Sequence, residues 1–185
     1  MGRKLIATIA ILALLAVTAL AVYAETASVT VSGGSLSVTP ADVTLSGVTL
    51  DGADQTATSA SGSNSWSATD ARGTGAGWNL TIDSTDFSDG GTNTIDISSA
   101  NQEFKIQLLD ANITVTTGNT KPTSSVTSLT AIPEAPAAAL KFVSAAVDEG
   151  MGTYAINPNF ELEVPADTVA ASYTATITIS AISGP

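Results

Sequence analysis

The carboxylates best placed to bind a cation lie in one short stretch of the chain. Asp83, Asp86 and Asp89 follow one another at intervals of three residues and are followed by two glycines. Calcium requires roughly six or more oxygen ligands, and the EF-hand loop that supplies them has a different spacing. The sequence therefore favours a polar turn, with a calcium site at these aspartates as the alternative. We expect no metal and no cofactor.

The sequence lacks the side chains that most often perform acid–base or nucleophilic catalysis. Its 185 residues include no histidine and no cysteine, which removes the usual general base, the commonest metal ligand and any disulfide. The many serines and threonines occur in neither a Gly-x-Ser-x-Gly nor a Ser-x-x-Lys motif, so none has an activating base nearby. No glycine-rich turn opens a helix as nucleotide binding requires. We expect that the protein is not an enzyme.

One arginine stands out because the chain has no other after residue 24. Arg72 belongs to the sequence Asp70-Ala71-Arg72-Gly73, which reads as a turn closed by an Asp–Arg ion pair. The favoured interpretation is a structural clamp within the turn. The alternative is that Arg72 binds a carboxylate or phosphate group of a ligand.

The two tryptophans lie in alternating segments. Trp78, Leu80 and Ile82 fall on one face of an extended chain, and Trp66 alternates with Ala68 in the same way. An alternating apolar face is normally buried, so the core is the favoured location of both indole rings. The alternative is that Trp78 or Trp66 forms a platform on which a sugar stacks.

Short segments in which apolar and hydroxyl-bearing residues alternate position these side chains. Such alternation is typical of strands, and threonine suits the outward positions because it is β-branched and polar. We expect strands at residues 26–31, 35–40, 42–50, 65–69, 78–82, 94–98, 103–109, 112–117, 140–145, 160–164 and 173–182. The pattern predicts an all-β fold, an antiparallel β-sandwich of immunoglobulin-like or similar Greek-key type. A short helix within residues 137–147 is the alternative to the strand there.

The first 24 residues have the features of a secretory signal peptide. Arg3 and Lys4 precede an apolar run over residues 5–22, and small residues lead to Ala24, after which we expect cleavage. The alternative is a retained membrane anchor, because about 18 apolar residues are long enough to span a bilayer. Cleavage implies a secreted, extracellular protein.

The rest of the chain is predicted to form a single domain at residues 25–185. It has 161 residues (185 − 24), with 4 basic and 17 acidic side chains and a net charge of −13. Such an excess argues against nucleic acid, and after signal cleavage against an anionic membrane, as partners. Residues 121–139 contain Pro122, Pro133 and Pro136 among serine, threonine and alanine, which predicts a long surface loop.

Two segments carry a more specific pattern than composition. In residues 68–87 the turn at Asp70 leads into a strand that contains Trp78-Asn79-Leu80. In residues 150–185 a strand ending in Val-Pro precedes a final strand that runs from Tyr173 to Pro185. In this order the two segments resemble the WxL domain of Gram-positive surface proteins, while the middle of the chain is divergent.

The resemblance implies a β-sandwich that attaches non-covalently to peptidoglycan or another envelope polymer at the cell wall, often together with other surface proteins. Ile179 stands where the family has its second tryptophan, and Ala181 where it has the following leucine, which implies a diverged member. The candidate binding residues, by resemblance and from the patterns above, are Trp66, Arg72, Trp78, Leu80, Tyr173 and Thr178.

A structural role is the competing hypothesis. Threonine-rich, charge-poor and cysteine-free β domains suit ordered assemblies, and an unpaired strand edge can template a second chain. In this hypothesis residues 25–40 leave their own sheet and complete the sheet of a neighbouring copy, which makes the protein a subunit of a fibre, a pilus-like filament or a surface layer.

Overall fold

The computed structural model describes residues 25–185, so the expected signal peptide and its cleavage site lie outside the described residues. The chain divides into two units, one ending at Val31 and one that comprises Ser32–Pro185. Residues 25–31 form no helix or strand, and Val29 and Val31 are each 87% exposed. No helix among the described residues is long and apolar enough to cross a membrane.

The regular secondary structure of the second unit consists almost entirely of short strands. Its one helix among the described residues is a 3-10 turn at Asp110–Asn112. The strands are β1 (Leu36–Thr39), β2 (Gln55–Thr58), β3 (Trp66–Asp70), β4 (Trp78–Ser84), β5 (Phe87–Ser88), β6 (Thr94–Ile95), β7 (Phe104–Gln107), β8 (Ile113–Gly118), β9 (Thr123–Ser124), β10 (Thr130–Ala131), β11 (Leu140–Ala145), β12 (Gly152–Ile156), β13 (Asn159–Val164) and β14 (Ile177–Ser183).

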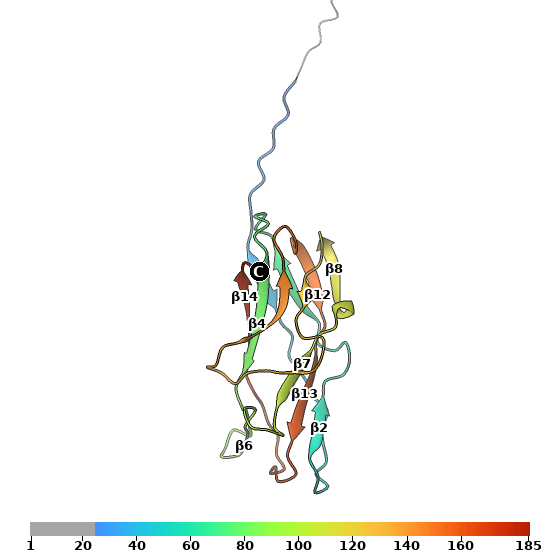
Figure 1. Ribbon diagram of the computed structural model, residues 1–185, viewed down its shortest axis with the longest axis vertical. Helices are drawn as coiled ribbons and strands as arrows, with labels where there is room; N and C mark the ends of the chain where they lie inside the picture. The colour runs from blue at the N-terminus through green and yellow to red at the C-terminus, as the bar shows by residue number, and fades with distance from the viewer. Residues whose placement is uncertain (1–24) are drawn as a thin grey trace, which may run out of the picture. The chain divides into compact units, whose positions relative to one another are not determined.

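The strands build two layers. One sheet has the order β1-β3-β12-β8 and another the order β2-β13-β7-β10. Three strands of the first sheet are each next in sequence to a strand of the second: β3 to β2, β12 to β13, and β8 to β7. The two sheets therefore form one long layer that is broken partway along (Figure 1). The other layer contains β14-β4-β11-β9, with the hairpin β5-β6 nearby. All strand pairs are antiparallel, which confirms the predicted antiparallel sandwich.

Alternation along the strands fills the space between the layers. In β3 and β13 every second side chain is buried, as a half-exposed strand requires. A chain of aromatic contacts runs through this core. Trp66 lies 5.6 Å from Phe160, Phe160 stacks on Phe104 at 5.5 Å, and Phe104 meets Phe87 edge-on at 5.0 Å between ring centroids. Such pairs stabilise a core by about 0.5–1.5 kcal/mol beyond area burial.

Several predicted strands are shorter in the structure, and hydroxyl or carboxylate side chains account for two of them. The segment 42–50 forms only one isolated bridge, between Leu45 and Ser59. Beside it, the Ser46 hydroxyl accepts the hydrogen bond from the Thr58 amide that a backbone carbonyl would accept in a regular strand. The strand predicted at 94–98 ends at Ile95 because the Asp96 carboxylate accepts bonds from Ser98 and Ser99 and closes a turn.

The two ends of the predicted pattern also differ. Residues 26–31 form no strand, and the last strand begins at Ile177 instead of at Tyr173. The segment 137–147 contains the strand β11 and no helix. Five strands, β2, β5, β9, β10 and β12, were not among those predicted. The alternation missed β2 because its sequence QTAT is polar, and β12 because it begins with a glycine.

The predicted surface loop at 121–139 is more firmly attached than its composition suggests. It contributes the short strands β9 and β10, and Val126 and Ile132 are only 2% and 1% exposed. The Ile132 amide also donates to the Phe104 carbonyl at 2.8 Å. The prolines keep most of the segment irregular, while these two side chains bury it in the core.

Truncating Ile132 should therefore destabilise the whole domain. Ile132→Ala removes a buried side chain and is expected to lower the free energy of unfolding by about 2–5 kcal/mol. Leu129→Ala is the matched control, since Leu129 lies in the same segment but is 44% exposed, and its effect should stay within about 0.5 kcal/mol. Urea unfolding followed by tryptophan fluorescence measures both. Equal effects of the two substitutions would show that the segment is not part of the core.

Candidate functional site

Arg72 holds three separate parts of the chain together. Its Nε and Nη2 donate to the two carboxylate oxygens of Asp70 at 2.8 and 2.9 Å. The same Nη2 donates to the Gly77 carbonyl at 2.8 Å, and Nη1 donates to the Ser183 hydroxyl. A guanidinium has five N–H donors, so little of it is left for a ligand. The structural clamp is the arrangement that the geometry shows.

Burial and hydrogen bonding make this pair electrostatically strong. The Asp70 side chain is 1% exposed and that of Arg72 is 16% exposed. The bonds from Arg72 lower the pKa of the Asp70 carboxyl, although burial acts in the opposite direction, and the bonds to Asp70 raise the pKa of Arg72. Both groups therefore stay charged in the pH range of ordinary aqueous media.

The lysines of the domain differ in their availability. Lys105 pairs with Glu103 and Glu163, and Lys121 donates to backbone carbonyls of Asp110 and Ile113. Lys141 is exposed, and its side chain makes no hydrogen bond or ion pair within residues 25–185. An anionic ligand would thus meet one unpaired cation, at Lys141, and not Arg72.

The tryptophans are part of the interior. Trp66, Trp78 and Leu80 are 1%, 0% and 0% exposed, so neither indole has a face on which a sugar can stack. Each ring N–H is satisfied internally, because Trp66 Nε1 donates to the Ala41 carbonyl at 3.0 Å and Trp78 Nε1 to the Gly150 carbonyl at 2.8 Å. The core interpretation of these residues is the one that the structure supports.

Gly150 explains how Trp78 is held. Its φ is +69°, and a Cβ at this position would lie 2.6 Å from Trp78 Nε1 and would overlap the Cβ of Ala145. Only glycine permits both the left-handed backbone and this close approach. The Trp78 ring also lies 6.3 Å from the ring of Tyr154. The two segments that resemble the WxL pattern are therefore in direct contact, through Trp78 and Gly150.

The last strand carries the remaining motif positions. Thr178 is exposed on the outer face of β14, opposite Asp83 of β4. Ile179 and Ala181 face inward and pack against the core. Ile179 also lines a hollow of about 300 Å³ beside Trp66. The position of the missing second tryptophan is therefore also an inward one.

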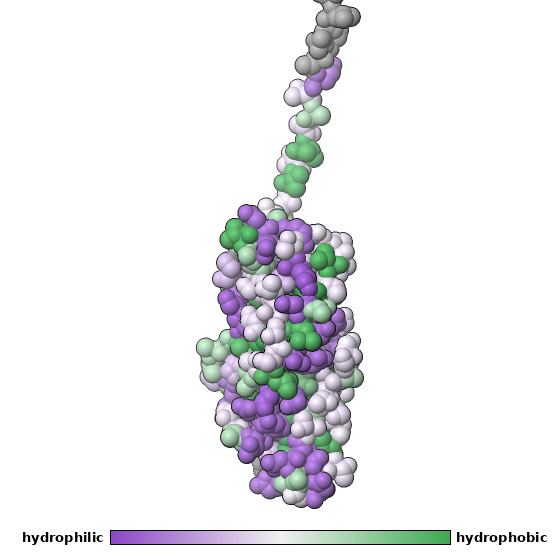
Figure 2. All heavy atoms as spheres, turned by 45° about the vertical axis from the view of Figure 1, so that its right-hand side comes forward, coloured by the Kyte–Doolittle hydropathy of each residue, from purple (hydrophilic) through white to green (hydrophobic). Residues whose placement is uncertain are grey.

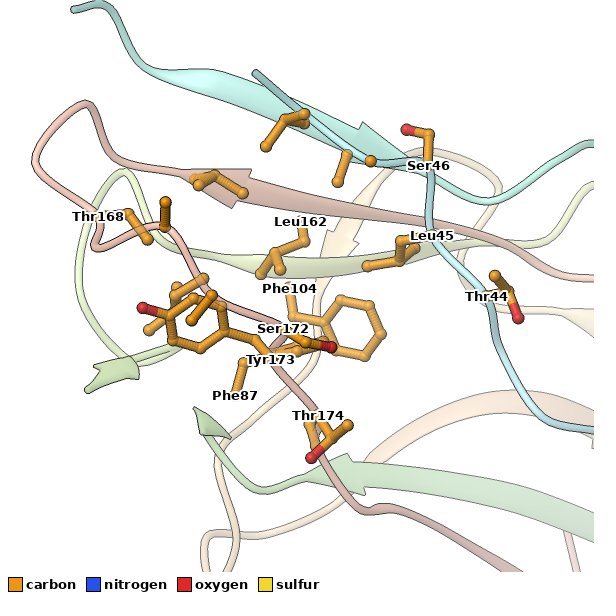
Figure 3. A pocket seen from close by; sticks show the side chains of 18 of the residues that line it. Thr44, Leu45, Ser46, Phe87, Phe104, Leu162, Thr168, Ser172, Tyr173 and Thr174 are labelled. Atoms are coloured by element: carbon orange, nitrogen blue, oxygen red, sulfur yellow. The ribbon is translucent and has the colours of Figure 1, made fainter. Parts of the chain in front are cut away.

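Tyr173 lies in a larger apolar groove of about 820 Å³ (Figure 3). Its hydroxyl donates to the Val169 carbonyl at 2.8 Å, and its ring faces the groove that Phe87, Phe104 and Leu162 also line. The predicted binding residues thus lie in four different places. Three are in the core (Trp66, Trp78 and Leu80), Arg72 is in the clamp, Tyr173 lines the groove, and Thr178 is on the surface. No sequence signal pointed to the groove, because it lies between two segments that the alternation assigned to strands.

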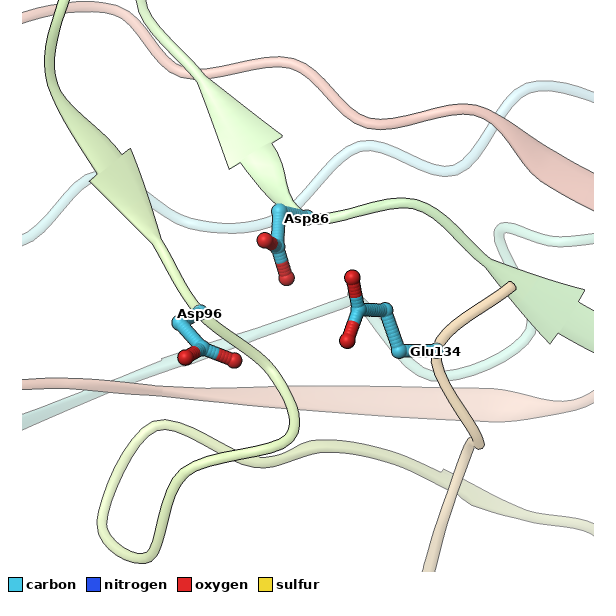
Figure 4. A group of neighbouring side chains, drawn as sticks. All are labelled: Asp86, Asp96 and Glu134. Atoms are coloured by element: carbon cyan, nitrogen blue, oxygen red, sulfur yellow. The ribbon is translucent and has the colours of Figure 1, made fainter. Parts of the chain in front are cut away.

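The predicted aspartates do not converge. Asp89 accepts bonds from Gly91 and Asn93 within its own turn, with a lowered pKa caused first by the Asn93 side chain, and Asp83 lies on β4. Asp86 instead approaches Asp96 and Glu134, with carboxylate oxygens within 4.8 Å of one another (Figure 4). Asp86 and Asp96 also accept local amide and hydroxyl hydrogen bonds. The three carboxylates have the ligand chemistry for a calcium ion but offer fewer oxygens than its usual shell.

The outer surface is mostly polar. Figure 2 shows hydrophobic residues as separate patches among hydrophilic ones. The outward side chains of the β1-β3-β12-β8 sheet form a row of hydroxyls across four strands, in which Ser37 pairs with Thr69, Thr69 with Thr153, and Thr153 with Thr117. The Thr69 and Thr153 hydroxyls are 3.1 Å apart. In the next row, Thr39 and Ser67 are followed by Ala155 and then by Thr114, and neither row bears a carboxylate.

The clamp makes a prediction about acid stability. Asp70→Asn should lower the free energy of unfolding at pH 7 by about 1.5–3 kcal/mol, because it breaks a buried, charge-assisted pair. A carboxyl whose pKa is lowered by folding contributes stability above its unfolded pKa of about 3.9. That contribution is lost as the pH falls through the lower folded value. Urea unfolding at a series of pH values should therefore show a weaker loss on acidification for Asp70→Asn.

Asp167→Asn is the matched control for this prediction, because Asp167 is exposed and makes no hydrogen bond or ion pair within residues 25–185. It should leave both the stability at pH 7 and its pH dependence within about 0.5 kcal/mol of the unchanged protein. If Asp70→Asn and Asp167→Asn gave the same acid profile, the pair would contribute nothing to acid stability.

Comparison with known proteins identifies the family. The model of the WxL domain, described as a surface cell wall-binding domain, matches residues 25–182, which is nearly all of the described chain. No curated protein and no solved structure matches it. The match includes the turn at Asp70, the buried Trp78 and all but the last residue of β14. The chain belongs to the WxL family of cell wall-binding surface domains.

Proposed function

We propose that the protein is secreted and is retained on the outside of the cell by non-covalent binding of its sandwich to peptidoglycan or another envelope polymer. The observation that supports this is the family match over residues 25–182 to a surface cell wall-binding domain. A non-catalytic role, alone or together with other surface proteins, fits the domain.

The binding surface has to be sought on the outside of the sandwich, because Trp78 and Leu80 are buried. The outer face of the β1-β3-β12-β8 sheet offers hydroxyl groups in register on neighbouring strands and no negative charge in its two rows. Hydroxyls both donate and accept hydrogen bonds, as the hydroxyl and amide groups of a glycan require. We assign polymer binding to this face.

Charge explains why this face suits the polymer better than the rest of the surface. The domain carries 17 acidic and 4 basic residues, and wall polymers bear carboxylates or phosphates that an acidic surface repels. Like charges brought together lower both the rate and the strength of association. The uncharged hydroxyl rows are a place where such a polymer can approach.

Binding to isolated sacculi tests the proposal. The mature protein should co-sediment with sacculi, whereas an unrelated acidic protein of similar size should stay in solution. Thr114→Glu/Thr117→Glu places two charges at exposed positions of the hydroxyl face and should weaken binding by about tenfold, equivalent to ~1.4 kcal/mol. Thr178→Glu/Ser180→Glu adds the same charge at exposed positions of β14 and should leave binding unchanged.

The two variants separate the possible results. Loss of binding in the Thr178→Glu/Ser180→Glu protein alone would move the polymer site to the β14 face. Co-sedimentation of the unchanged protein no better than that of the acidic control would refute wall binding by this domain.

A further inference from the structure

The large apolar groove is an opening in the sandwich. On one side lie residues 43–50, on the other residues 168–175, and between them the side chains of Ala57, Phe104 and Leu162 form the floor (Figure 3). Phe104 belongs to the aromatic chain of the core. The groove therefore lies directly over the core, in which Phe104 and Leu162 are 0% and 4% exposed.

The backbone on both sides of the groove is unpaired. Within residues 25–185, no hydrogen bond joins the backbone of residues 47–50 or of residues 170–172 to any other residue. The first of these segments has the alternating sequence of a strand but is held to β2 only near Leu45 and Ser46. Unpaired N–H and C=O groups beside an apolar floor are the arrangement to which an extended segment adds as a new strand.

The chain itself contains a segment of the required chemistry. Residues 25–31 read ETASVTV, with Ala27, Val29 and Val31 on one face of an extended strand and threonine and serine on the other. Val29 and Val31 are each 87% exposed, and residues 25–31 belong to no strand. As a strand the seven residues would extend ~23 Å at about 3.3 Å per residue. Residues 43–50, which form one side of the groove, would extend ~26 Å on the same basis, so the two lengths are similar.

The attachment point of this segment lies far from the groove. The Gly34 amide donates to the Ala71 carbonyl at 2.7 Å, and a Cβ on Gly33 would overlap the Arg72 carbonyl, so the chain is held against the turn of the clamp. The clamp also binds Ser183, near the C-terminus. Figure 1 shows the C-terminus at one end of the folded unit, and β2, β13 and β6, which contribute to the groove, toward the other end.

We propose that residues 25–31 of one copy insert as a strand into the groove of a second copy, with Val29 and Val31 toward Phe104 and Leu162. The attachment point at Gly33 and Gly34 and the groove lie at opposite ends of the folded unit, so each copy can give a strand to one neighbour and receive one from another. Repetition of this head-to-tail contact grows as a filament where the rotation between copies does not close a ring. The sequence suggested an exchange of residues 25–40. In the structure β1 (Leu36–Thr39) is already paired with β3 of its own sheet, so we limit the exchanged segment to residues 25–31.

Assembly of the mature protein tests the proposal. The unchanged protein should form polymers that grow with concentration, measured by analytical ultracentrifugation and negative-stain microscopy. Val29→Asp/Val31→Asp places charges on the face that enters the groove and should leave monomers. Ser28→Asp/Thr30→Asp adds the same charge to the opposite face of the same segment and should still polymerise. Polymers from the first variant, or equal loss of assembly in both, would overturn the proposal.

Cross-linking tests the position of the strand. The chain has no native cysteine, so a disulfide forms only between introduced ones. A mixture of Val29→Cys and Ala57→Cys proteins should give a covalent heterodimer on oxidation. The control mixture pairs Val29→Cys with Thr58→Cys, whose side chain is exposed whereas that of Ala57 is 4% exposed. It should react at least about tenfold more slowly, a difference of ~1.4 kcal/mol in effective barrier. Equal rates in the two mixtures would contradict insertion into the groove.

A monomeric unchanged protein at its highest soluble concentration would refute self-assembly, and the groove would then be left to a strand of another surface protein.

Discussion

The bidentate pair of Asp70 and Arg72 is the interaction on which the architecture depends most. Asp70 ends a strand of one layer, Gly77 precedes the first strand of the other, and Ser183 ends the last strand of the chain. A single guanidinium bonds to all three. The layers of a small sandwich without disulfides are held together mainly by non-directional apolar packing. The planar fork of the arginine adds direction, and the backbone of the same turn holds Gly33 and Gly34.

The residues that identify the family turn out to be the residues that build the core. Trp78 donates its N–H to Gly150, which lies 72 positions later in the chain, and the close contact leaves no room for a side chain on that glycine. Such contacts constrain residue type more strongly than a surface does, because a buried polar group must keep its partner. The pattern of these buried residues therefore identifies the domain without locating a ligand site.

Much of the fold could be predicted from the two-residue alternation, since it reports which side chain faces the core. The burial of Trp66 and Trp78 follows from it directly, whereas at residues 137–147 the pattern left a strand and a short helix open, and the structure has the strand. The failures arise where a side chain replaces a backbone partner. Ser46 accepts a bond that a carbonyl would accept in a regular strand, and Asp96 closes a turn within an otherwise strand-like sequence. Alternation alone cannot distinguish a strand that is paired from one that lacks a neighbour, and the groove arises from this difference.

The carboxylates show the same limit at a smaller scale. Spacing along the chain grouped Asp86 with Asp83 and Asp89, whereas the fold brings it to Asp96 and Glu134 from other segments. Proximity in sequence is informative for turns, in which Asp89 binds residues two and four positions ahead. It is uninformative for groups that meet across a sandwich, since those depend on register between strands.

The central claim is that the tryptophans belong to the scaffold and not to the ligand surface. Trp66 and Trp78 are the two tryptophans of the chain and are at most 1% exposed, so fluorescence reports on them alone. Acrylamide quenching of the folded mature protein should be several-fold weaker than quenching of a free tryptophan derivative, and adding saturating sacculi should leave it unchanged. Quenching as strong as that of the free derivative, or protection that appears only when sacculi are added, would contradict the account.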